Sequence, residues 1–177
     1  GGLFGFINSA QQVFVDVFHA PELFTTIFAL IAMFMAASSL LNSRIVGRLG
    51  MRRVSHGALL GYIALTSLHA LVALAGHESL WTFAILQGAA MFCFGLIGPN
   101  FGAMAMEPLG HVAGTASSVQ GFVTTVIGAL LGFYIGQHFN GTVVPLTLGF
   151  ALCGIAALVV VLIVERGRLF HPAPGRP

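Results

Sequence analysis

The chain has 177 residues, of which 57% are hydrophobic and only 7% are charged. Soluble domains carry roughly 25% charged residues, so a chain this apolar is not expected to cover itself in water, and the composition indicates lipid as its solvent. The net charge of +2 comes from arginines that cluster along the chain, so it does not indicate an acidic partner such as nucleic acid.

Six apolar segments follow one another, separated by charged or polar residues. The first segment, 3–15, has about 13 residues, whereas a spanning helix needs roughly 20. Because no methionine or basic leader precedes it, we interpret it as a truncated helix whose start lies upstream. Full spans are expected at 22–41, 54–76, 80–103, 113–137 and 143–164. The sequence therefore predicts an all-α, polytopic transmembrane helix bundle over residues 1–164.

The arginines indicate an orientation for this bundle. Four of them lie within 42–53, and the other three lie in the Pro/Gly-rich tail, 165–177, for which we expect disorder. Five spans place this loop and this tail on the same side of the membrane. The intervening turns near Asp16, Glu78 and Asn140 contain no Arg or Lys. The positive-inside rule then predicts that loop 42–53 and the C-terminus are cytoplasmic.

Loop 42–53 carries a recognisable pattern besides its charge. Its basic residues could simply retain it in the cytoplasm, but Gly47, Arg48, Gly50, Arg52 and Arg53 also stand at characteristic spacing. This stretch resembles the second-half copy of the major facilitator loop signature, Gly-x-x-x-Asp-Arg-x-Gly-Arg-Arg, whose Gly-x-Arg-Arg end is matched here. The acidic residue of that signature is absent, and the spacing is compressed.

Two further stretches extend the resemblance over nearly the whole chain. The segment 108–118 is similar to the Ala-Gly-Thr-Ala-Ser segment of the Bcr/CflA drug-resistance branch, and Phe6-Ile7-Asn8-Ser9-Ala10 with Phe14, Pro21 and Phe24 is similar to the seventh helix of that branch. The resemblance implies the C-terminal half of a proton-driven efflux transporter in the bacterial inner membrane. Its partners would be the lipid bilayer, the missing N-terminal half, a small-molecule substrate and protons.

A glycine stripe marks the predicted helix 113–137. Its members are Gly114, Gly121, Gly128, Gly132 and Gly136. Small residues let helices approach closely in lipid, where no hydrophobic force joins them. The stripe could be a dimer seam, but in a chain of many helices we interpret it as internal packing.

Uncharged polar residues within the spans are the candidate substrate contacts. Gln87, Met91 and Phe94 follow helical spacing on one face of the span 80–103. The whole candidate set comprises Asn8, Gln11, Gln12, Gln87, Met91, Phe94, Asn100, Gln120 and Thr124. The resemblance implies that the helices bearing them line the central cavity. The alternative for each is a hydrogen bond between helices, at about 1 kcal/mol each.

Acidic residues are not expected in mid-membrane, so a proton-carrying acid is expected in the missing half. His69 shares a helical face with Tyr62 and Thr66 and could relay protons. Because its helix corresponds to a peripheral one in the resembled family, we interpret His69 as a packed or interface-facing side chain.

The sequence indicates a carrier rather than an enzyme. We find no nucleophile–base pair, phosphate loop, metal site or cofactor motif, and we interpret Cys93 and Cys153 as small core residues. Proton-coupled efflux by alternating access is the favoured function. A carrier of another solute, such as a sugar, nucleoside or metabolite, and a small self-associating membrane protein without transport activity remain as alternatives.

Overall fold

The computed structural model describes residues 1–170, and these contain six α-helices and no strand. The expected all-α fold class is confirmed. The helices are α1 (Gly2–Gln12), α2 (Phe24–Leu49), α3 (Met51–Leu74), α4 (Leu80–Met106), α5 (Ala113–Gln137) and α6 (Val144–Val164). Three short elements join them: a π-helical turn, η1 (Val13–Val17), and two 3-10 segments, η2 (Pro21–Leu23) and η3 (Glu107–Val112).

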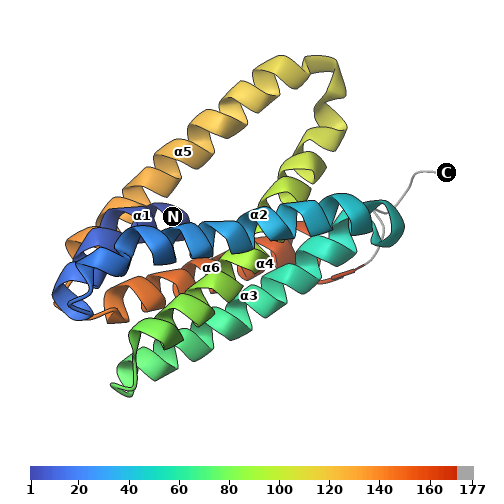
Figure 1. Cartoon of the computed structure of the whole chain (residues 1–177). Helices are drawn as coiled ribbons and strands as arrows, with labels where there is room; N and C mark the ends of the chain where they lie inside the picture. The colour runs from blue at the N-terminus through green and yellow to red at the C-terminus, as the bar shows by residue number, and fades with distance from the viewer. Residues whose placement is uncertain (171–177) are drawn as a thin grey trace.

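Helix α4 is central in the bundle. It packs along α2 and α3, while α6 packs along α3, and α1 contacts both α5 and α6. Small residues bring α4 close to α2, since Gly88 lies under the ring of Phe34 and Gly95 lies against the backbone of Met35. Figure 1 shows α5 leaving the bundle at an angle and diverging from α4, to which η3 connects it at its far end.

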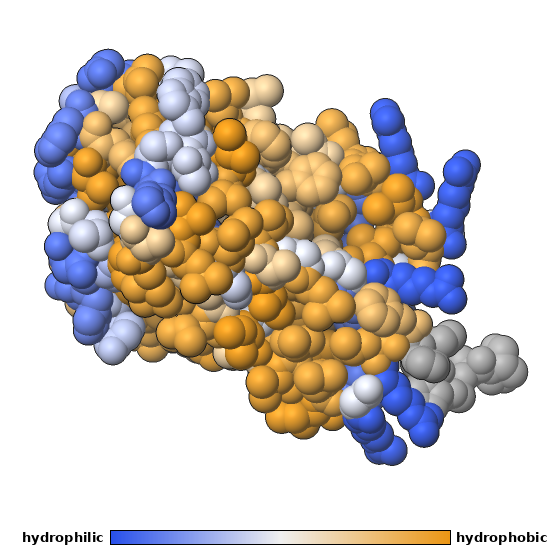
Figure 2. Space-filling model, turned by 90° about the horizontal axis from the view of Figure 1, so that it is seen from below, coloured by the Kyte–Doolittle hydropathy of each residue, from blue (hydrophilic) through white to orange (hydrophobic). Residues whose placement is uncertain are grey.

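The surface has the pattern of a membrane protein. Figure 2 shows hydrophobic side chains over the middle of the molecule and hydrophilic ones gathered at two opposite ends. Four continuous helical stretches within residues 1–170 are long and apolar enough to cross a membrane: Pro21–Leu49, Met51–Leu74, Leu80–Gln137 and Val144–Val164. The third comprises 58 residues and includes both α4 and α5, so its length suffices for two crossings of roughly 20 residues each.

The expectation of a loop over 42–53 is wrong. Helix α2 continues to Leu49, α3 begins at Met51, and only Gly50 separates them. Gly50 has φ +82° and ψ 150°, a conformation that side-chain-bearing residues rarely adopt. The arginines continue the helix beyond the apolar segment because they have good helix propensity, and Arg48 in the last turn complements the helix dipole.

The start of the expected disordered tail is in contact with the bundle. The Glu165 carboxylate accepts a hydrogen bond from Arg52 Nε at 3.0 Å, and the Phe170 amide donates to His56 Nδ1 at 3.1 Å. The expectation of disorder is therefore wrong for residues 165–170. The remainder of the expected tail, 171–177, including Arg176, lies outside the described residues.

Candidate functional site

A groove runs between α4 and α5 where these helices diverge. One cavity of about 520 Å³ lies among α1, α4 and α5, and its walls include Phe4, Phe94, Gly98, Val123 and Thr124. A second hollow of about 560 Å³ continues toward η3 and is lined mainly by apolar residues of η3 and the flanking turns of α4 and α5. Val123 lines both, so the two hollows adjoin along α5, and together they are called the groove.

The groove receives three of the candidate substrate contacts. Phe94 and Thr124 line the first cavity and Gln120 the second. The Thr124 hydroxyl donates to the Gln120 carbonyl at 2.8 Å, which leaves its oxygen free to accept a hydrogen bond from a ligand. The groove is thus a largely apolar and aromatic surface with few polar groups, as binding sites for small amphiphilic molecules commonly are.

A smaller, more polar hollow holds two further candidates. Asn8 and Gln12 of α1 line a space of about 260 Å³ together with Phe133, Gly136 and Gln137 of α5. Gln11 is exposed on the same helix. The polar residues of α1 therefore lie on the α5 side or at the surface, outside the groove between α4 and α5.

Three candidates on α4 are buried within the bundle. Gln87, Met91 and Asn100 are each at most 2% exposed. Helical spacing places Gln87, Met91 and Phe94 near one face, but the part of α4 that carries Gln87 and Met91 is packed within the bundle. Only Phe94, where α5 diverges, lines the groove. Gln87 and Met91 are thus core residues here, contrary to their expected place on the cavity wall.

Asn100 joins two helices. Its Nδ2 donates to Asn42 Oδ1 at 2.7 Å and to the Leu96 carbonyl at 2.7 Å. The amide is therefore already engaged between α4 and α2, as in the alternative of an interhelical hydrogen bond. Gln87 differs, because its buried Nε2 has no hydrogen-bond partner among the described residues.

The glycine stripe of α5 has two unlike halves. Gly128, Gly132 and Gly136 lie against Phe4 and Asn8 of α1, so this half provides close packing inside the chain. Gly114 and Gly121 have nothing within 4 Å of the position of an added Cβ. The difference follows from the tilt of α5, since only its C-terminal part reaches α1.

The arginine motif forms the end of the molecule where α2 and α3 meet. Gly47 and Arg48 are exposed on the last turns of α2, and Gly50 turns the chain. Arg52 is paired with Glu165 of the C-terminal segment, whereas Arg53 is exposed. This ion pair ties α3 to the end of α6, so part of the motif has a packing role.

A buried pair of titratable residues lies at the opposite end. His69 Nε2 and Glu78 Oε1 are 3.3 Å apart, with side chains 2% and 8% exposed. The sequence predicts no buried carboxylate, because Glu78 falls in the turn between two spans. That expectation is wrong, since the turn folds Glu78 back onto α3. A carboxylate directly before a helix N-cap, with a histidine about two turns upstream, is a signal that could have found the pair.

Metal chemistry has no obvious location in the described part of the chain. Among residues 1–170, no group of three or more His, Cys, Asp and Glu side chains is placed to hold a metal ion. The groove between α4 and α5 and the His69–Glu78 pair are separate features of the structure.

Comparisons with known proteins identify similar transporters. The chain is 27% identical over 166 residues to a bicyclomycin resistance protein homolog of Haemophilus influenzae, covering 90% of this chain and 40% of that protein. It is 26% identical over 151 residues to an uncharacterized MFS-type transporter of Bacillus subtilis, YdgK, covering 82% and 36%. No protein-family model matches the chain. No solved structure matches it.

These relatives confirm the resemblance to the major facilitator superfamily and its Bcr/CflA-like branch. The chain spans 40% and 36% of the lengths of the two curated relatives. It is accordingly similar to a part of each, and its helices make it a multi-pass membrane protein.

Proposed function

We propose that this chain is the C-terminal half of a secondary transporter that exports drugs or small amphiphilic molecules in exchange for protons. In such a transporter, two helical halves rock against each other around a central site and expose it alternately to the two sides. The resistance protein and the MFS-type transporter to which the chain is similar support this proposal. The arginine end would face the cytoplasm of the bacterial inner membrane.

The groove between α4 and α5 is the observation that carries the proposal. Its walls combine the rings of Phe4 and Phe94 with aliphatic side chains and the hydroxyl of Thr124. Broad apolar walls with a few orienting polar groups suit ligands of varied shape and low polarity. The groove is open on one side, where the N-terminal half of the transporter would complete the cavity.

The lining favours an amphiphile over a sugar or nucleoside. A polar solute would need several hydrogen-bonding groups converging on it, because each unpaired polar group costs free energy when it is buried. Self-association without transport is the other alternative, and the unpacked Gly114 and Gly121 are the observation in its favour. Crosslinking in native membranes separates the alternatives, since a homodimer weakened by Gly121→Leu would favour a seam.

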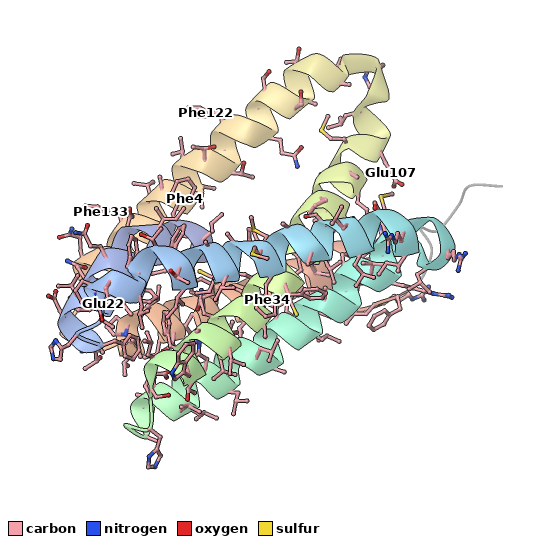
Figure 3. All side chains as sticks on the ribbon, viewed as in Figure 1. Phe4, Glu22, Phe34, Glu107, Phe122 and Phe133 are labelled. Carbon is pink, nitrogen blue, oxygen red and sulfur yellow. The ribbon has the colours of Figure 1, made fainter. Side chains whose placement is uncertain are left out.

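The test uses the full-length transporter in drug-susceptible bacteria. Phe94→Ala and Thr124→Val change the groove wall. We expect each substitution to alter the range of compounds to which the cells are resistant. Phe122→Ala is the matched control, because Phe122 is 69% exposed and points away from the groove on α5 (Figure 3). Immunoblotting checks that the variants reach the membrane in equal amounts. Resistance unchanged for every exported compound would exclude the groove as the substrate site.

A further inference from the structure

The pair formed by His69 and Glu78 is placed where two helices meet at a tight turn. Helix α3 ends at Leu74, and Gly76, with φ +71°, reverses the chain. The amides of Gly76 and His77 donate to the carbonyls of Ala73 and Val72 at 3.1 and 3.2 Å, which fixes the turn. Glu78 thereby points back toward α3, directly before the Ser79 N-cap of α4.

The surroundings of the pair are dry on the inner side. Phe83, which is 0% exposed, lies with its ring centroid 5.4 Å from that of His69 at an interplanar angle of 64°. Behind it, the rings of Phe14 and Phe18 lie 6.1 and 5.4 Å from Phe83. Aromatic side chains therefore cover the pair on the side that faces the rest of the bundle.

The polar atoms of the pair are incompletely satisfied. Apart from the 3.3 Å approach of Nε2 to Oε1, neither Nε2 nor either carboxylate oxygen of Glu78 has a hydrogen-bond partner among residues 1–170. A buried carboxylate without donors is costly when charged, and a proton on either partner removes the net charge. The positive end of the α4 dipole acts in the opposite direction and favours the ionised carboxylate.

Other charged groups leave the pair electrically isolated. Within their bounds, α1, α4, α5 and α6 carry no Asp, Glu, Lys, Arg or His. The arginines lie at the opposite end of α2 and α3 and beyond α6. The titratable side chains near this end that belong to the connecting segments are all exposed, and they are Asp16, His19, Glu22, His77 and His138.

We propose that His69 and Glu78 together form a proton-binding site that couples this half of the transporter to the proton gradient. One proton, taken from water, converts the pair from one net negative charge to none, and its release returns the proton to water. Only an O–H or N–H bond forms or breaks, and the proton is held between the two side chains, whose Nε2 and Oε1 lie 3.3 Å apart. The coupling role rests on the proposed function, whereas proton binding by the pair does not.

Phe83 connects the pair to a helix that lines the groove. Phe83 contacts both the His69 ring and the ring of Phe14 in η1, the π-helical turn that follows α1. Turns of this kind occur frequently at functional sites in helices. A change of charge at the pair would shift the position of Phe83 and, through it, the end of α1, whose other end forms part of the groove wall.

Proton binding is tested first by pH-difference infrared spectroscopy of the full-length protein in lipid. In the difference between spectra at acidic and neutral pH, we expect a protonated-carboxyl band that Glu78→Gln abolishes and Glu78→Asp retains. His69→Gln should shift the midpoint of that band. Glu22→Gln is the matched control, since Glu22 is an exposed carboxylate at the same end, and it should leave the band intact. A spectrum unchanged by Glu78→Gln would overturn the proposal.

Coupling is tested next in proteoliposomes, with ethidium as the transported probe. Glu78→Gln should lose accumulation driven by a pH gradient but keep ethidium exchange at equal pH, and Glu22→Gln should keep both. If Glu78 titrates and gradient-driven accumulation persists in Glu78→Gln, the coupling role is excluded. If the wild-type protein shows neither activity, the proposed function fails, while the infrared result still decides whether the pair binds a proton.

Discussion

Gly132 and Gly121 belong to the same glycine stripe of α5 but meet different surroundings. A Cβ at Gly132 would lie 2.7 Å from the backbone carbon of Phe4 and 2.8 Å from the nitrogen of Gly5. A Cβ at Gly121 would meet nothing within 4 Å. The stripe therefore contains one position where the absence of a side chain is required and another where it is not.

Gly132→Ala is expected to destabilise the protein. Adding a methyl group to this contact forces α1 and α5 apart, and overpacking typically lowers the free energy of unfolding by about 1–3 kcal/mol. Gly121→Ala should cause no loss and, through better helix propensity, add up to about 1 kcal/mol. Unfolding of the full-length variants in mixed detergent, followed by circular dichroism, measures both. Equal losses for the two substitutions would contradict the packing seen at Gly132.

At the scale of single residues, the sequence could identify candidates but not their burial. Helical spacing groups Gln87, Met91 and Phe94 on one face, yet it carries no information on which helices surround that face. Thr124 and Phe94 line the groove because α5 tilts away from α4, and that tilt depends on contacts with α1. The burial of Glu78 could not be predicted for a related reason, since a residue in a turn is expected to be solvated unless the turn folds inward.

The link between α2 and α3 depends on a single backbone conformation. Gly50, at φ +82° and ψ 150°, occupies a region that is essentially restricted to glycine. Gly47, three residues earlier, is helical and has nothing within 4 Å of an added Cβ. The backbone conformation at Gly50 thus requires glycine and that at Gly47 does not, although both residues belong to the same sequence motif.

Gly50→Ala is expected to lower the free energy of unfolding by about 1–3 kcal/mol, the usual cost of placing a side chain in such a conformation. Gly47→Ala should be neutral or stabilising by up to about 1 kcal/mol, because alanine favours the helix. Thermal unfolding of both variants, with dye detection of exposed cysteines, provides the comparison. A tolerated Gly50→Ala would show that the helix ends can meet in another conformation.

Most of the helices could be predicted from the sequence. Long apolar runs without charge mark α2 to α6, because a span of the bilayer needs about 20 such residues. The extension of α2 to Leu49 could not be predicted, since hydropathy reports where the lipid ends and not where a helix ends. The π-helical turn Val13–Val17 likewise has no hydropathy signal, because it changes the hydrogen-bond register without changing composition.

The whole molecule has two polar ends of different charge. Arg44, Arg48 and Arg53 are exposed at the end where α2 and α3 meet, whereas the other end exposes acidic and histidine side chains such as Glu22 and His77. Figure 3 shows Glu22 and Glu107 at these opposite ends of the bundle. An excess of arginine in short connections favours their retention in the cytoplasm.

Cysteine labelling would determine the orientation of α3, which Gly47 and His77 flank. In a full-length background whose native cysteines, including Cys93 and Cys153, are replaced by alanine, Gly47→Cys and His77→Cys each introduce one exposed thiol. A membrane-impermeant maleimide should label His77→Cys in whole cells and Gly47→Cys only in inverted vesicles. The reverse pattern would place the arginine end outside and the His69–Glu78 pair on the cytoplasmic side. Labelling of both positions from one side would mean that α3 does not cross the membrane.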